Sequence, residues 1–496
     1  MTIRNIFLKA VGNGEFFRKY INDILHLIEG AFAHFLMEVK TEFASNYDKK
    51  LAGRRSTIIC VGAKCLKVLA VSSLSTVFML RGVMAAPLEM SVNGAVEAAL
   101  KNNTTVVTAQ ATSKMYRARI KEYYGSVYPQ LSANAQYTRN IEKSASFLGD
   151  TQVKVGLNNS YAGSLDLNQV LWSGGKVHAG IKMAYTYSAA SEEQLKMAQD
   201  SITKSVKQMY YSVLLSSAMI GIQKETLNLA RQHLDTIKAQ YQQGLASDLA
   251  VMRQTVEVSN TEPALTQAQN LYEEGLIDLI NLMGLDPETG ISLSDDFAVP
   301  NDGAGDLNDF YKTALSSRPE YRNMKYQRDL YRQMIVIEKA AHYPSLNAFA
   351  SRQFQGQSDS GFPGNNNRNW SLATGLNLSL PIFSGGSTAS RVKQAGIQAE
   401  IAETNLNELE RKIKIEVKKA WLVLKEASER LRSQTTAVET ARKTLTSTEV
   451  RFRNGLASQL EINDVSLALN KSRTLYIQAQ HDACSAYTEF KWTLGE

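Results

Sequence analysis

The sequence predicts a mainly helical protein that also carries strands suited to a membrane β-barrel, built by tandem duplication. Three observations support this fold class. Long stretches without proline carry a heptad-like apolar pattern, shorter stretches alternate apolar with small or polar residues, and most of the chain repeats at a fixed offset. The first pattern is typical of long packed helices, and the second is typical of half-buried strands.

The duplication is visible in pairs of matching segments. "LWSGGKV" at 171–177 matches "IFSGGST" at 382–388, and each of these segments is followed by a "GLAS" turn. Both pairs are 211 residues apart, whereas the upstream Tyr-Pro pairs are 215 apart. A repeat of this length is a substantial structural unit. The predicted organisation is a leader at 1–86, a first repeat at 88–284, a linker or equatorial region at 285–306 and a second repeat at 307–495.

Residues 1–86 are expected to be an export leader. They hold 12 of the 55 Lys and Arg residues but 6 of the 48 Asp and Glu residues, so the rest of the chain is almost neutral. A broad basic surface for nucleic acid is therefore not expected. An apolar stretch followed by small residues predicts cleavage near Ala85-Ala86.

Each repeat is expected to contain a long helical hairpin. No proline occurs from 130 to 262 or from 382 to 496, and proline costs about 3 kcal/mol inside a helix. The apolar pattern predicts a first helix of about 65 residues, a tight turn, and a returning helix of about 37. Pro263 predicts a kink in the first returning helix. The seam of the second long helix consists of Leu406, Leu409, Ile413, Val417, Ala420, Leu424, Ala427 and Leu431.

A β-hairpin is expected before each long helix, at about 130–172 and about 345–383. Strands of about ten residues with one apolar face suit an outer-membrane barrel, although a soluble sheet packed on one face would show the same alternation. Two hairpins give four strands, and small barrels need at least about eight. Because open sheet edges cannot lie in lipid, membrane strands would require assembly with other copies of the chain.

The order of these features resembles the TolC-type outer-membrane efflux protein family. The shared order is signal peptide, helix, Tyr-Pro-x-Leu, hairpin, "SGG", long helix, "GLAS" and returning helix, with everything after the signal peptide duplicated, over nearly all of 88–496. The resemblance implies a homotrimeric channel-tunnel. Each copy would give four strands to a shared twelve-stranded barrel in outer-membrane lipid and its helices to a hollow periplasmic α-barrel.

The resemblance also implies the function. Such proteins are passive exit ducts of tripartite efflux or type I secretion systems, and they are not enzymes. They conduct substrates to the cell exterior from a periplasmic adaptor and an inner-membrane transporter of the RND or ABC class. They need no cofactor or metal and bind no nucleic acid. The resemblance does not specify the cargo.

The resemblance assigns roles to two sets of residues near the helical turns. Glu461 and Asp464 match the acidic residues that ring the narrow periplasmic aperture, and their i, i+3 spacing places them on one helix face. The turns themselves match the tips at which adaptors dock. The tip segments are 244–247 and 455–458, with docking residues Gly244, Leu245, Ser247, Gly455, Leu456 and Ser458.

The first repeat differs at the aperture. The equivalents of Glu461 and Asp464 are Ala250 and Arg253. We therefore hypothesise that Arg253 pairs with one of these acids across neighbouring hairpins and helps to hold the entrance shut. The basic residue that the family uses in its second tip loop is replaced here by Ala457.

The two "SGG" segments are interpreted as corners where a membrane strand continues into a tunnel helix. Glycine allows the sharp turn, and the neighbouring Trp172 and Phe383 suit a membrane interface. The alternative of a phosphate loop at "SGGK" lacks the first glycine of that motif. The corner glycines are Gly174, Gly175, Gly385 and Gly386.

A non-enzymatic alternative also fits part of the pattern. A structural periplasmic coiled-coil or adaptor protein without a pore would explain the heptads and the tight turns. It would not explain two hairpins with apolar faces, and an adaptor would carry a separate β domain between its helices.

Overall fold

The computed structural model describes residues 88–298, 305–454 and 456–496. The expected leader at 1–86 with its cleavage near Ala85-Ala86, part of the linker (299–304) and Gly455 lie outside the described residues. Within the described part of the chain, no helix combines the length and the apolarity needed to cross a membrane.

The first repeat folds into helices that flank a set of strands. Its elements in order are β1 Leu88–Met90, α3 Val92–Asn102, α4 Thr104–Gly125, β2 Gln130–Arg139, β3 Ser144–Leu148, β4 Thr151–Val155, β5 Asn159–Ser173, α5 Lys176–Gln242 and α6 Asp248–Met283. The connecting strand β6 Ile291–Leu293 pairs in parallel with β1. This parallel pair brings the linker back to the start of the described chain.

The second repeat follows the same order without the extra strands β3 and β4. Its elements are α7 Leu307–Ser317, α8 Pro319–Ala340, β7 Ser345–Ser358, the short 3-10 helix η1 Asn365–Asn367, β8 Arg368–Ser379, α9 Ser387–Arg453 and α10 Gln459–Leu494. The β8 strand ends at Ser379, short of the expected limit near 383, because Pro381 cannot donate to a strand ladder.

Helices α5 and α9 have 67 residues each, and α6 and α10 have 36 each. Helix α6 continues through Pro263, and the kink expected there stays a prediction. The two repeats use equivalent positions for their cores. Val206 and Leu279 in the first repeat correspond to Val417 and Phe490 in the second, and all four are almost fully buried.

The main sheet has four antiparallel strands in the order β2-β5-β7-β8. Register gives it one face of mostly apolar residues and one face of mostly polar residues. Leu165, Ala350 and Leu376 belong to the apolar face, while Ser164 and Ser351 belong to the polar face. The outer edges of β2 and β8 pair with no other strand of the described chain.

The register shifts once, between Val170 and Trp172 of β5. Leu171 is the extra residue, so Trp172 pairs with Leu346 of the apolar face. Strict alternation would have placed Trp172 on the polar face together with Val170. The bulge therefore moves this aromatic residue to the apolar side immediately before the corner.

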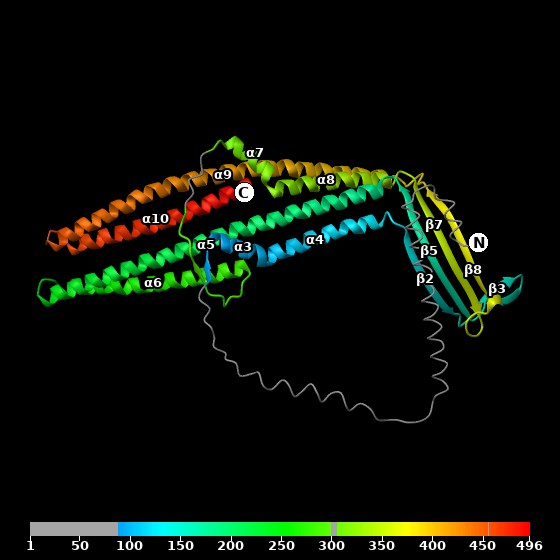
Figure 1. Ribbon diagram of the computed structural model, residues 1–496, viewed down its shortest axis with the longest axis horizontal. Helices are drawn as coiled ribbons and strands as arrows, with labels where there is room; N and C mark the ends of the chain where they lie inside the picture. The colour runs from blue at the N-terminus through cyan, green and yellow to red at the C-terminus, as the bar shows by residue number, and fades with distance from the viewer. Residues whose placement is uncertain (1–87, 299–304, 455) are drawn as a thin grey trace, which may run out of the picture. The chain divides into compact units, whose positions relative to one another are not determined.

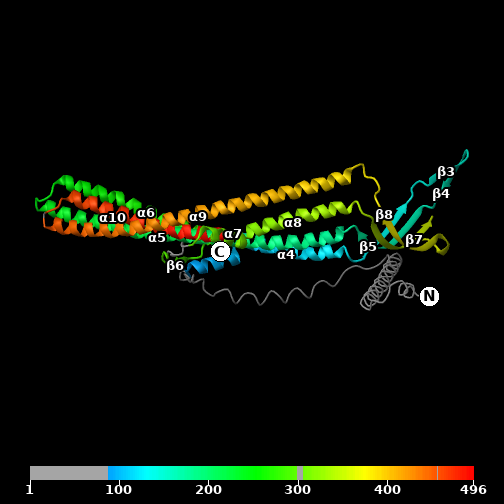
Figure 2. The same cartoon turned by 90° about the horizontal axis from the view of Figure 1, so that it is seen from above.

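Each strand of the main sheet adjoins a long helix, and the helices keep the order of the strands. Helix α5 packs between α4 and α8, and α8 packs between α5 and α9 (Figure 1). Helix α10 contacts both α9 and α5. Figure 2 shows the sheet at one end of these helices and the α5–α6 and α9–α10 turns at the other.

Candidate functional site

The strand-to-helix corners depend on left-handed backbone conformations. Gly174 and Gly175 have φ of 61° and 88°, and Gly385 and Gly386 have φ of 60° and 79°. A side chain strains the backbone in this region, which glycine enters freely. The expectation that glycine serves a turn at each corner agrees with these angles.

The two corners differ in what surrounds them. A Cβ atom on Gly174 would lie 2.8 Å from the Ala340 carbonyl oxygen and 2.8 Å from the Tyr343 Cβ. Among the described residues, a Cβ atom on Gly385 would meet nothing within 4 Å. Within one protomer the first corner is therefore packed against the end of α8, and the second corner is open.

Aromatic residues border the sheet at both of its ends. Trp172 is 56% exposed and Phe383 is 88% exposed near the corners. At the opposite end, five rings form a continuous row across the strands and the β7–β8 loop. Their consecutive centroids are 5.1, 5.2, 6.0 and 4.9 Å apart, in the order Tyr137, Tyr161, Phe362, Phe354 and Trp370. Aromatic residues near both ends of the strands are typical of a transmembrane barrel, which has aromatic girdles at both membrane interfaces.

The helical turns are closed by backbone hydrogen bonds. In the first turn, the Leu245 N–H donates to the Gln240 carbonyl at 2.8 Å, and the Gly244 N–H donates to the Tyr241 carbonyl at 2.9 Å. This pair of bonds is a Schellman motif, which needs a left-handed residue such as Gly244, with φ of 73°. In the second turn the Leu456 N–H donates to the Arg451 carbonyl at 2.8 Å.

The serine that follows each turn caps the returning helix. The Ser247 hydroxyl accepts from the Ala250 N–H at 3.3 Å, and the Ser458 hydroxyl accepts from the Glu461 N–H at 3.2 Å. Each tip also presents two exposed leucines, one in the turn and one in the first turn of the returning helix. These are Leu245 and Leu249 in the first tip, and Leu456 and Leu460 in the second. Sequence reasoning missed Leu249 and Leu460, although the 211-residue offset relates them.

The two predicted aperture acids are exposed on α10. Glu461 and Asp464 flank Ile462, which is buried toward the hairpin. Within the described part of one protomer, neither carboxylate has an ion-pair partner, and Arg253 is also exposed without one. The predicted pairing of Arg253 is therefore not formed inside one protomer. Arg451, another basic residue near the tip, donates from Nη2 to the Leu456 carbonyl at 3.1 Å.

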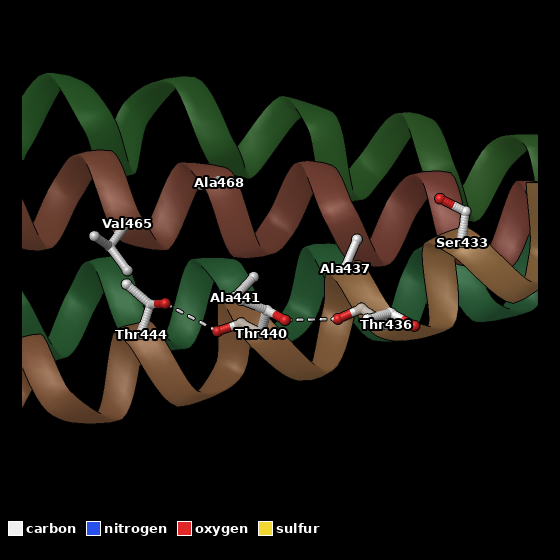
Figure 3. A pocket seen from close by; sticks show the side chains of 8 residues that line it. All are labelled: Ser433, Thr436, Ala437, Thr440, Ala441, Thr444, Val465 and Ala468. Carbon is white, nitrogen blue, oxygen red and sulfur yellow. Dashed lines mark hydrogen bonds between the residues drawn. The ribbon is translucent and has the colours of Figure 1, made fainter.

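A shallow groove runs along the α9–α10 hairpin, a few turns from the tip. Figure 3 shows that small side chains on α9 leave this space. The Thr440 hydroxyl donates to the Thr436 carbonyl and the Thr444 hydroxyl donates to the Thr440 carbonyl, both at 2.9 Å. The groove residues are Ser433, Thr436, Ala437, Thr440, Ala441 and Thr444 of α9 with Val465 and Ala468 of α10.

Larger side chains fill the equivalent place in the first hairpin. Ile222 and Gln254 stand at the positions of Ser433 and Val465, and both are buried. The Gln254 side-chain amide donates to the Ala230 carbonyl at 3.1 Å. The groove is therefore a feature of the second hairpin, and the two repeats are not interchangeable there.

A hydrogen-bonded carboxylate lies on the polar face of the sheet. One carboxylate oxygen of Asp166 accepts from the Ser164 hydroxyl at 2.6 Å and from the Asn134 amide at 3.3 Å. The other oxygen accepts from the Ser351 hydroxyl at 2.5 Å. These partners come from β2, β5 and β7. Sequence reasoning placed Asp166 on a strand but gave it no role.

The described residues contain no group of three or more His, Cys, Asp or Glu side chains that could hold a metal ion. Cys484 is buried in α10, and burial raises the pKa of its thiol to about 11. A thiol in this state is a poor nucleophile. The candidate functional features are therefore surfaces and turns. They are the sheet with one apolar and one polar face, the glycine corners, the tips with exposed leucines, and the acids near the start of α10.

Known proteins share this arrangement. The family model described as "Outer membrane efflux protein" matches residues 95–285 and 310–496. The alkaline protease secretion protein AprF of Pseudomonas aeruginosa is 21% identical over 340 residues, which cover 68% of this chain and 70% of AprF. The probable efflux pump outer membrane protein TtgC of Pseudomonas putida is 24% identical over 383 residues, which cover 74% of this chain and 75% of TtgC.

A solved structure gives the same result for the fold. The outer membrane protein VceC of Vibrio cholerae superposes with a TM-score of 0.70 at 19% identity, over 82% of this chain and 96% of VceC. The predicted fold class and the resemblance stated from the sequence are both confirmed. The comparisons support the duct and not the poreless coiled-coil alternative.

Proposed function

The chain belongs to the outer membrane efflux protein family, and from this premise we propose that three copies form one closed duct. The protein is a passive outer-membrane channel for efflux or secretion and is not an enzyme, and its helical part extends into the periplasm. It acts with a periplasmic adaptor and an inner-membrane pump. The number of copies, the aperture and the docking tips are the parts that we propose.

The unpaired sheet edges carry the proposal of a trimer. Strand β8 exposes both its faces, with Leu372, Leu376 and Leu378 more than 60% exposed on the apolar side. Its outer edge, like that of β2, has no strand partner in the described chain. Lipid offers no hydrogen bonds to such edges. Pairing β8 of each copy with β2 of the next closes a barrel of twelve strands.

Helix α9, like strand β8, has a side that no other described element of the protomer covers. Ile401 of α9 corresponds to Ala190 of α5 by the 211-residue offset. Ala190 is 6% exposed because α8 covers it, whereas Ile401 is 55% exposed. A neighbouring copy would cover α9 with its own α4, in the way that α8 covers α5. Such head-to-tail contacts form a ring when the rotation from one copy to the next closes.

The leucine-bearing tips support docking of an adaptor. Leu245 is 75% exposed and Leu456 is 68% exposed. They belong to the α5–α6 and α9–α10 turns, which lie at the ends of the hairpins farthest from the sheet (Figure 1). Apolar side chains presented on rigid, hydrogen-bonded turns are suited to a protein partner. Each copy would supply two such tips. The two hairpins differ, because only the α9–α10 hairpin carries the groove described above.

The acidic pair supports a cation-attracting aperture. In a ring of three copies, Glu461 and Asp464 would place six carboxylates around one axis. Rings of acidic side chains select cations in channels. Both residues are exposed and have no ion-pair partner within the described protomer, so their charge can face the pore or meet Arg253 of a neighbouring hairpin.

Neutralising these acids tests the aperture. We expect the double variant Glu461→Gln/Asp464→Asn to weaken block by a trivalent cation, added on the tip side, by about tenfold or more, because a loss of ~1.4 kcal/mol in binding is tenfold. Single-channel recording in planar bilayers measures the block. Glu408→Gln is the control, since Glu408 is an exposed acid of α9 that already pairs with Lys412 at 3.0 Å. Equal block in the wild type and the double variant would rule out the acidic aperture.

The lock proposed for Arg253 has a separate test. We expect Arg253→Ala to raise conductance and passive leak, because the arginine would no longer hold the acids of a neighbouring hairpin. Adding Arg253→Ala to the double acid variant is expected to change nothing further, since removal of either partner removes the pair. Lys238→Ala, at an exposed cation of α5, is the control. Unchanged conductance and leak in Arg253→Ala would remove the lock.

A further inference from the structure

We infer that Asp166 sets the charge selectivity of the β-barrel section of the duct, as a second cation-selecting ring separate from the acids at the helical aperture. The inference rests on the proposed assembly of copies into a closed barrel. It concerns a residue for which neither the sequence pattern nor the resemblance supplies a role.

Register assigns Asp166 to the pore wall. It forms one row across the sheet with Ser132, Ser351 and Ala373. The two adjacent rows face the opposite way and carry mostly apolar residues. A barrel in lipid turns its apolar face outward, so this polar face lines the lumen.

Among the described strands of the main sheet, Asp166 is the sole ionisable residue on that face. The other positions facing the same way carry serine, threonine, asparagine, glutamine, alanine, glycine, valine or phenylalanine, all within the described strands. The polar-face positions are 130, 132, 134, 136 and 138 of β2, 160–170 (even numbers) of β5, 345–357 (odd numbers) of β7 and 369–379 (odd numbers) of β8.

The hydrogen bonds around Asp166 hold its carboxylate in the ionised form without cancelling its charge. Ser164, Ser351 and Asn134 are neutral donors on three adjacent strands. Donors to a carboxylate favour the charged form. In the described part of the protomer no Lys, Arg or His forms an ion pair with Asp166. The negative charge therefore stays fixed at one height of the wall.

The size of the effect follows from electrostatics. Three copies would place three unit charges around one lumen, and at 0.1 M salt each of these charges acts over a Debye length of ~10 Å. We expect Asp166→Asn to lower the cation-to-anion permeability ratio by about two- to fivefold at 0.1 M salt. At 1 M salt the Debye length is ~3 Å, so the difference between the wild type and the variant is expected to vanish.

The zero-current potential across a bilayer with unequal KCl concentrations measures this ratio. The full chain with Glu461→Gln/Asp464→Asn is used as the background, so that aperture charges do not contribute. Ser132→Ala, in the same row, and Arg352→Gln, on the opposite face, are the controls and are expected to leave the ratio unchanged. A conducting Asp166→Asn channel with the ratio of its background overturns the inference. Absence of any channel from the wild-type chain instead contradicts the proposed function.

A second measurement covers the case in which Asp166→Asn does not assemble. Asp166→Cys can be modified in the lumen by a negatively or a positively charged methanethiosulfonate, while the buried Cys484 is protected. The negative reagent is expected to restore cation preference and the positive reagent to reverse it. Equal ratios after both reagents, with modification confirmed by mass, also overturn the inference.

Discussion

Replacing Gly174 by alanine is expected to prevent the first corner from folding. The backbone there has φ of 61°, which costs an alanine about 1–2 kcal/mol. The new Cβ would also lie 2.8 Å from the Ala340 carbonyl oxygen, which belongs to backbone and cannot rotate away. Overpacking of this kind costs a further ~1–3 kcal/mol. Together these costs come to about 2–5 kcal/mol, against the roughly 5–15 kcal/mol that stabilises typical folded proteins.

Protease resistance of the protein extracted from outer membranes, and its yield there, report this loss. Gly149→Ala is a matched control, because Gly149 has the same φ of 61° but nothing within 4 Å of its Cβ position. We expect the control to keep nearly normal yield and Gly174→Ala to lose most of it. If the two variants behave alike, contact with the end of α8 is not what requires glycine at this corner.

Replacing Gly385 by alanine is expected to block assembly of the copies while leaving each protomer folded. The position has φ of 60° and open space around it in one protomer. The internal duplication predicts which residues of a neighbouring copy would fill that space. The partners of Gly174 are Ala340 and Tyr343, and their first-repeat equivalents are Gly125 and Tyr128. In a closed ring, Gly125 and Tyr128 of the neighbouring protomer would pack against Gly385.

Migration of a heat-resistant oligomer in detergent gels, combined with protease resistance, distinguishes Gly385→Ala from Gly174→Ala. Gly385→Ala is expected to yield protomers that resist protease but do not migrate as a trimer, since its added Cβ meets only the neighbour. Gly361→Ala in the β7–β8 loop, with φ of 67° and nothing within 4 Å, is the control. Full trimer formation by Gly385→Ala would contradict the proposed equivalence between contacts inside and between protomers.

Much of the fold could be predicted because its signals are local. The apolar spacing along α9, together with the absence of proline, predicts one long helix with a buried seam. Ile413 and Val417 of that seam are buried. The glycine pairs mark corners because few residues other than glycine accept left-handed angles. The cap at Ser458 follows from its place just before a helix. In each case neighbours in the chain supply the physical cause.

Other features arise only from contacts between distant segments. The extra pair β3–β4 and the bulge at Leu171 leave no clear mark in the alternation of residues, yet the bulge decides on which face Trp172 lies. Gly174 and Gly385 belong to the same "SGG" motif, yet the first is closely packed and the second has open space beside it. Glu461 and Asp464 could be located by resemblance, but whether Arg253 reaches them depends on neighbouring copies.

The sequence by itself determined the duplication, the long hairpins, the two hairpins with apolar faces and the membership of a channel family. These features can be read from periodicity and repeated motifs, because helices and strands form according to residues that are a few positions apart in the chain. The tertiary structure alone decided that Asp166 meets Ser351, 185 residues away, on a face whose described strands carry no other ionisable group. Such a meeting depends on strand register, and a shift of one residue would exchange the faces.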